Sequence, residues 1–295
     1  MGTSSSSKGS PGKVPMVPPW VPAVPPLAPA PDAGTPPEAA PPDAAPAGPP
    51  VVTNNVPVAN PALSLPPIRL APAGRFAAAR GSASSFAASG SARDLKRSMR
   101  HYVRKGYGGA QTAAQRFGGT ANSAGALYSV LTPGQPGAAA DSGARIDRAL
   151  LAGRSASEIM DAVVEAVGPA EGTQDAEASR KAIRGCLSEI LERYPEANLL
   201  ELSEEQRAFA VERYVALDVF QRYALDLGKT IQDKAPSPSA VLSRLKEVKE
   251  YIRETVSASF RKLKAAGQHL SAGRIAQIVQ GALLDAFQVF ERNTE

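Results

Sequence analysis

Four arginines near residue 100 recur at a helical spacing. Arg93, Arg97, Arg100 and Arg104 stand four, three and four residues apart, so a helix over residues 91–106 places all of them on one face. Guanidinium groups bind phosphate and carboxylate oxygens through paired N–H donors. The spacing therefore predicts a cationic face that contacts an anionic partner, with simple solvation of that face as the alternative. Apolar residues on another side of the same helix predict contact with a core.

The segment around these arginines, residues 74–119, is strongly basic. It holds nine Arg or Lys residues and one acidic residue, whereas residues 120–295 hold 21 basic and 24 acidic residues. Five aromatic residues are interleaved with the cations: Phe76, Phe86, Tyr102, Tyr107 and Phe117. Cations that grip a phosphate backbone and rings that stack on bases are the combination used for single strands, so nucleic acid is one expected partner. An acidic protein surface, or solvation alone, explains the same residues.

Residues able to perform catalysis are scattered rather than grouped. The one cysteine, Cys186, lies on an apolar helical stripe, which is typical of a core residue and not of a reactive thiol. His101 is expected on the surface among arginines, His269 has no metal- or base-partner pattern, and Glu204–Glu205 begin a helix, where the dipole favours acids. Phosphate-loop, nucleophile-elbow and zinc-protease motifs are absent. The sequence thus predicts no enzyme, no metal and no cofactor.

The first 73 residues are predicted to form a long disordered tail. They contain 21 of the 27 prolines and a single aromatic residue, Trp20, and cannot bury enough apolar surface to offset the entropy of ordering. Gly2 is small enough for Met1 to be removed, which leaves a mobile α-amine at the chain end.

A membrane location is not expected. No run of about 18 apolar residues exists, and the N-terminus lacks the charged start and apolar core of a secretory signal. One cysteine cannot form an internal disulfide, which fits a reducing compartment. We therefore expect a cytoplasmic protein that does not bind membranes.

The sequence pattern of the rest of the chain predicts helices. Residues 74–132 are expected to form a basic, Gly/Ala-rich helical region, and residues 145–295 a helical bundle, with a linker at 133–144 between them. In the basic region, residues 107–131 are expected to form two short helices. Strand-like alternation is missing, so the predicted fold class is all-α.

Helix boundaries in the predicted bundle are marked by capping residues. Ser155 and Glu158 form a capping-box pattern, and Ser203 begins a helix that is apolar on most sides. That helix carries a polar strip, Asp218, Arg222 and Asp226, at intervals of four residues. Its nearly all-round apolar character predicts a central, buried position.

Two stretches of the sequence resemble the QatB family of the Qat anti-phage defence system. The resemblance rests on the start, MGTSSSSKGSPGKVPMVPPW, and on residues 74–131, which include HYVRKGYGG at 101–109. It covers residues 1–20 and 68–131 well and the C-terminal half in general character. The long Pro/Ala linker at 27–67 departs from the family pattern.

This resemblance implies a non-enzymatic protein encoded beside an ATPase, a QueC-like deazaguanine enzyme and a TatD-like nuclease. It also implies that the QueC-like enzyme attaches a deazaguanine to Gly2, within a recognition segment at residues 1–26. Residues of that segment expected to contact the modifying enzyme are Ser4, Ser5, Pro18, Pro19 and Trp20.

Overall fold

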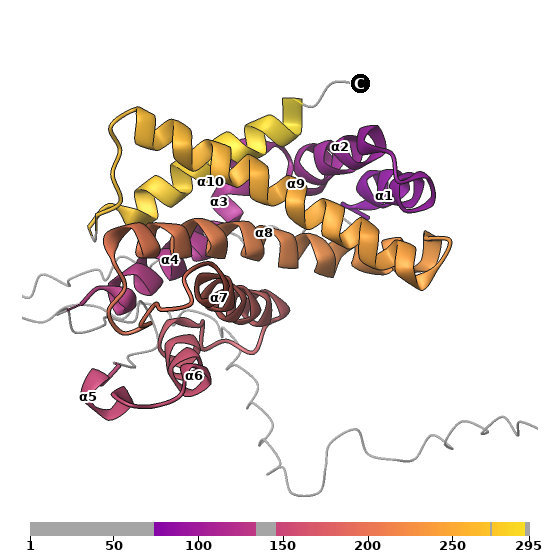
Figure 1. The fold of residues 1–295 in the computed structure, drawn as a ribbon. Coiled ribbons are helices and arrows are strands. Elements are labelled where there is room, and N and C mark those ends of the chain that lie inside the picture. The colour runs from indigo at the N-terminus through magenta and orange to yellow at the C-terminus, as the bar shows by residue number, and fades with distance from the viewer. Residues whose placement is uncertain (1–73, 134–145, 272, 293–295) are drawn as a thin grey trace, which may run out of the picture. The chain divides into compact units, whose positions relative to one another are not determined.

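The longest helix of the described chain, α8 (Glu204–Lys234), lies between the other helices (Figure 1). The structure is a computed structural model that describes residues 74–133, 146–271 and 273–292, and all regular elements in these ranges are helical. The all-α prediction is confirmed. The predicted tail, residues 1–73, and most of the predicted linker lie outside the described residues.

Five helical segments precede the first gap. They are α1 (Ala77–Ser89), α2 (Ala92–His101), the π-helix η1 (Tyr102–Tyr107), α3 (Ala110–Arg116) and α4 (Gly118–Leu131). Helices α1 and α4 pack against α8, and α3 and α4 pack against α10. The two short helices expected over residues 107–131 are present as α3 and α4, and α1 lies within the helical region expected over residues 74–132.

The remaining helices surround α8 on two sides. Helices α5 (Arg148–Leu151), α6 (Ala156–Val167) and α7 (Gln174–Arg193) come before it, and α9 (Pro238–Ala265) and α10 (Ile275–Arg292) follow it. Figure 1 shows α9 and α10 on one side of α8 and α6 and α7 on the other. Since α7, α9, α1 and α4 all contact α8, its predicted central position is confirmed.

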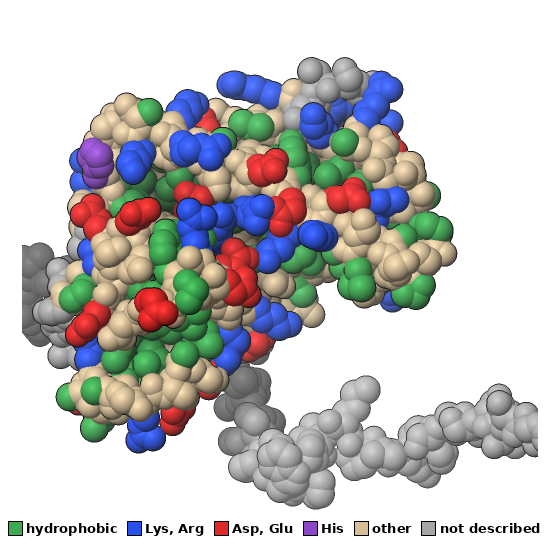
Figure 2. Space-filling model, in the orientation of Figure 1, with side chains coloured by type: hydrophobic (Ala, Val, Ile, Leu, Met, Phe, Trp, Pro, Cys, Tyr) green, Lys and Arg blue, Asp and Glu red, His purple; other side chains and the backbone are tan. Residues whose placement is uncertain are grey.

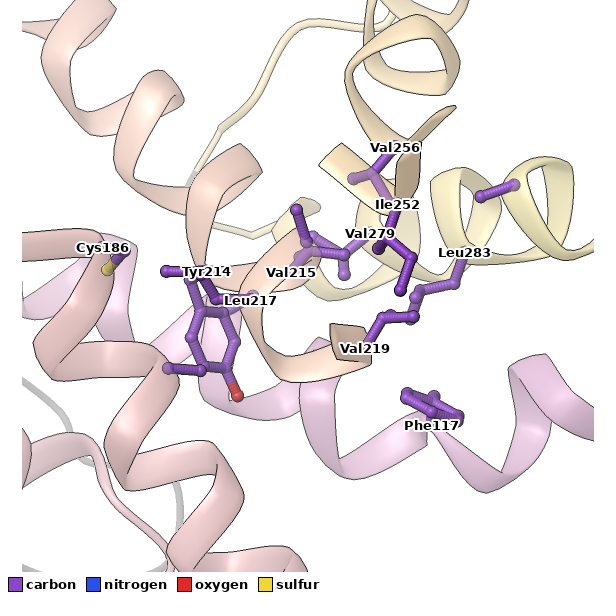
Figure 3. Close-up of a cluster of buried hydrophobic side chains, with 14 of the residues drawn as sticks. Phe117, Cys186, Tyr214, Val215, Leu217, Val219, Ile252, Val256, Val279 and Leu283 are labelled. Carbon is purple, nitrogen blue, oxygen red and sulfur yellow. The ribbon is translucent and has the colours of Figure 1, made fainter. Parts of the chain in front are cut away.

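Side chains from several helices converge in the core (Figure 3). Val215 and Val219 of α8 are fully buried against Ile252 of α9 and Val279 and Leu283 of α10. Burying each such side chain contributes about 1.5–3 kcal/mol. Contacts of this kind, between residues far apart in sequence, hold the helices in their places.

Capping residues fix most helix starts as expected. Ser155 and Glu158 form a reciprocal capping box, with the Ser155 N–H donating to Glu158 at 2.9 Å. At the start of α2 no reciprocal box is formed. Ser91 caps α2, but Asp94 instead accepts a hydrogen bond from the hydroxyl of Ser89 at 2.6 Å. Ser89 is closer to the carboxylate because α1 ends immediately before α2 begins.

The helix expected over residues 91–106 is not regular throughout. It changes from α to π geometry after His101. In the π-helix Gly106 lies against Phe76, where a Cβ atom would stand 2.3 Å from the Phe76 ring. The ring of Phe76, 4% exposed, therefore requires a glycine at this position. Sequence spacing alone does not reveal this contact.

None of the helices in the described ranges is long and apolar enough to cross a membrane.

Candidate partner-binding surface

The four spaced arginines lie on the outer side of α2 and η1. Arg93, Arg97 and Arg104 are exposed and Arg100 is half-buried. The residues expected to face the core are all buried: Leu95, Met99, Tyr102 and Val103. The two-sided character of this segment is confirmed. We call its cationic side the α2–η1 arginine face.

Three of the four arginines on this face have no carboxylate partner among the described residues. Within the described ranges, no carboxylate lies at ion-pair distance from Arg93, Arg100 or Arg104. The Nε atom of Arg100 is buried and makes no hydrogen bond there. In Figure 2 several Lys and Arg side chains lie at the edge of the molecule near α2, beside the C-terminal end of α10. The charges of Arg93, Arg100 and Arg104 are thus available to an external anion.

Charges elsewhere in the molecule are used differently. Glu189 of α7 pairs with Lys249 of α9 at 2.9 Å and with Arg213 of α8 at 3.6 Å. Over α7, α8 and α9 the acidic and basic side chains are intermixed in Figure 2. The C-terminal helices therefore neutralise many of their charges internally, in contrast to the α2–η1 arginine face.

The aromatic residues of the basic segment are not on its surface. Relative exposures are 4% for Phe76, 0% for Phe86, Tyr102 and Phe117, and 9% for Tyr107. The prediction that these rings stack on nucleic-acid bases is wrong, because they occupy the core-facing positions of their helices. Anion binding by this segment depends on its cations alone.

His101 joins two helices and does not stand free on the surface. Its Nδ1 atom lies 2.6 Å from the Ser82 hydroxyl and 3.2 Å from the Ala78 carbonyl of α1. Because Ser82 donates its own proton to Ala78, the imidazole N–H is the donor in the contact with Ser82. Burial lowers the pKa of His101, and adjacent arginines lower it further. The pair holds α2 against α1 and is not arranged for removal of the Ser82 proton.

The polar strip of α8 points into the helix junction. Asp218, which is 0% exposed, accepts hydrogen bonds from Thr120 of α4 at 2.6 Å and from Nε of Arg222 at 3.1 Å. Arg222 also binds Asp175 of α7 at 2.8 Å. Burial raises the pKa of Asp218, while Arg222 and Thr120 oppose the shift. This network connects α4, α7 and α8.

Asp226, the last residue of the strip, accepts a hydrogen bond from the Tyr102 hydroxyl of η1 at 3.0 Å. The sequence shows the spacing of the strip. It does not show that the strip joins α4, α7 and η1 to α8. Its main contribution is to position η1 and α4 on α8.

Acidic residues and a histidine line a cavity in the described part of the molecule. Glu204 and Glu205 of α8 and His269, from the loop between α9 and α10, border a space of about 590 Å³. Among the described residues no hydrogen bond joins these side chains. A general base needs such a partner within reach, so the cavity holds no preformed catalytic pair.

Cys186 is a core residue, as its helical stripe predicts. It is 0% exposed and its thiol donates to the Ile183 carbonyl. Burial raises the pKa of the thiol well above its usual range, so almost no thiolate forms at neutral pH.

Cys186→Ala is therefore expected to lower stability without a separate effect on activity. Removal of a buried sulfur costs about 1 kcal/mol or more, because the surrounding helices cannot close the space completely. Urea unfolding followed by circular dichroism measures this loss. Loss of phage protection in a variant that is equally folded and equally abundant would instead identify a working thiol.

The expected modification site and its recognition segment belong to the N-terminal end of the chain. In residues 74–133, 146–271 and 273–292, no three His, Cys, Asp or Glu side chains are grouped to hold a metal ion. Gly2, Ser4, Ser5, Pro18, Pro19 and Trp20 lie outside the described residues. The modification of Gly2 remains a prediction.

Fold and surface together define an all-helical protein with a one-sided cationic face. Residues 108–290 match the family model described as Qat anti-phage system associated protein QatB. The chain therefore belongs to the QatB family. The match includes the C-terminal helices, which resemble the family in general character, and leaves out α1 and α2. Comparisons with curated proteins and with solved structures gave no match.

Proposed function

We propose that this QatB-family protein is a non-catalytic assembly component of the Qat system that binds an acidic partner through the α2–η1 arginine face. The observation that carries the proposal is the lack of described carboxylates near Arg93, Arg100 and Arg104. Like charges at helical spacing repel one another by about 0.2–0.5 kcal/mol per pair. Binding of an anionic partner neutralises these charges and so relieves their repulsion, which favours the complex.

The partners that family membership suggests are the other components of the system. The resemblance implies an ATPase, a QueC-like enzyme and a TatD-like nuclease. We propose that this chain contacts the first two directly. The same resemblance supports a second role for this chain, as the protein to which the QueC-like enzyme conjugates a deazaguanine at Gly2. In this proposal the helical body is the scaffold and the N-terminus is the substrate.

The α2–η1 arginine face is expected to be essential for defence but not for folding. Replacing its four arginines by Gln should abolish protection against phage while the circular dichroism spectrum stays helical, because the side chains point away from the core. A matched control replaces Arg154 and Arg184, which are exposed but ion-paired, and should retain protection. Full protection in the Gln variant would refute the proposed role of the face.

A second candidate function is a nucleic-acid-binding adaptor that acts through residues 74–119. The observation that favours it is the near absence of acids there, since Asp94 is the one acidic residue and is hydrogen-bonded by Ser89. Arginines carry the binding in both functions, so both weaken with salt. Binding measured separately to a labelled DNA duplex and to each purified Qat component, at one salt concentration, separates the two functions.

A further inference from the structure

A second group of arginines, separate from the α2–η1 arginine face, is held on aromatic rings. The guanidinium of Arg75 lies 4.5 Å from the ring centroid of Phe76 and 5.7 Å from that of Tyr107. The guanidinium of Arg116, at the end of α3, lies 5.9 Å from the same Tyr107 ring. Two cations from different elements thus approach one ring of the π-helix.

Contact with an aromatic ring orients a guanidinium without using its hydrogen-bond donors. The five N–H groups lie in the guanidinium plane, so contacts to a ring through its flat face leave them free. Arg75 and Arg116 make no ion pair or side-chain hydrogen bond within the described ranges. The positive charges of Arg75 and Arg80 lower the pKa of Asp226. The carboxylate of Asp226, however, accepts its hydrogen bond from Tyr102 and none from Arg75. The donors of both arginines therefore have no hydrogen-bond or ion-pair partner among the described residues.

We infer that Arg75 and Arg116, placed by Tyr107, form a binding site for the phosphodiester backbone of double-stranded DNA. This inference deepens the second candidate function and rests on it. Protein–DNA interfaces are far more positive than protein–protein interfaces, and the segment that contains this site has nine cations and one acid.

A duplex fits this site better than a single strand. The aromatic rings of the segment are buried, with Phe86 and Phe117 at 0% exposure, so they offer no platform for unstacked bases. Binding through phosphates alone favours the ligand with the higher charge density, which is the duplex. The expected binding is independent of base sequence.

Fluorescence anisotropy with a short labelled DNA duplex, measured over a salt series, tests the inference on the full-length protein. Replacing Arg75 and Arg116 by Gln should weaken binding by roughly tenfold for each arginine. The slope of log K against log salt should fall by about two, because two phosphate contacts are lost. Arg261→Gln with Arg274→Gln, which removes equal charge from exposed sites elsewhere, should leave the slope unchanged.

Lysine variants distinguish binding that needs the guanidinium geometry from binding that needs only positive charge. Replacing Arg75 and Arg116 by Lys preserves net charge but removes the planar donor fork, and should still weaken binding severalfold. Tyr107→Phe keeps the ring and should bind as the parent protein does. The inference would be overturned if the Lys variant bound the duplex as tightly as the parent protein, or if the protein did not bind the duplex at all. It would also be overturned if polyglutamate of equal charge displaced the duplex. The defence phenotype of the α2–η1 arginine face does not depend on these results.

Discussion

Asp218→Ala is expected to destabilise the helical body by about 3–5 kcal/mol, the cost of breaking a buried ion pair by removing one partner. The carboxylate is fully buried and holds Thr120 and Arg222. Without it, the Thr120 hydroxyl loses its acceptor and the guanidinium keeps Asp175 as its one remaining carboxylate. Helix α4 then loses its hydrogen bond to α8, and Arg222 loses the buried acceptor that orients it toward α7. Urea unfolding followed by circular dichroism gives the free energy directly.

Asp218→Asn provides the matched comparison. Its side-chain oxygen still accepts from Thr120 and Arg222, and the neutral group avoids the burial cost that raises the pKa of Asp218. We therefore expect it to recover most of the stability lost in the alanine variant. Asp175→Asn, at the exposed end of the network, should cost about 1 kcal/mol or less. An alanine variant as stable as the parent would show that the network does not support the fold.

The raised pKa also fixes the sign of a pH effect. When burial raises the pKa of an acid in the folded state, the folded protein binds the proton more tightly than the unfolded chain. The contribution of Asp218 to stability is then greatest at low pH and decreases as pH rises through its pKa. Asp218→Asn should lack this component, so lowering the pH should stabilise the parent protein relative to the asparagine variant.

Several features of the fold were predictable because they depend on local chemistry. Caps at Ser155 and Ser203 and the stripe that contains Cys186 follow from side-chain type and helical period. The central place of α8 follows from its nearly all-round apolar surface. Such signals are carried by residues within one helix.

Other features depend on contacts between distant residues. Helix α1 is rich in Ala, Ser and Gly, and its weakly amphipathic pattern does not mark it as a separate helix. The π-helix depends on Gly106 meeting Phe76, and the position of His101 depends on Ser82. Aromatic residues among cations suggest base stacking, but the packing places their rings inside. Composition identified the cations of the candidate surface and could not say which of them are held on rings.

In the complete Qat system, Gly2 is expected to be fully conjugated once Met1 has been removed. An α-amine has a pKa of about 7.7–8.0, whereas that of a lysine is about 10.4. At neutral pH the terminal amine is therefore neutral and nucleophilic far more often than Lys8 or Lys13. Gly2 has no side chain to obstruct an active site. Mass spectrometry of the N-terminal peptide, after expression with the neighbouring components, measures the expected mass increase.

Variants of the terminal segment test both the acceptor and its recognition. Gly2→Pro replaces the primary amine by a hindered secondary amine, and Trp20→Ala removes the apolar anchor on its proline-rich frame. Both should lose the mass increase together with phage protection. Lys8→Arg with Lys13→Arg removes the competing side-chain amines and should leave the modification intact. An unmodified Gly2 in a fully active complex would exclude conjugation as the role of this terminus, because defence would then proceed without it.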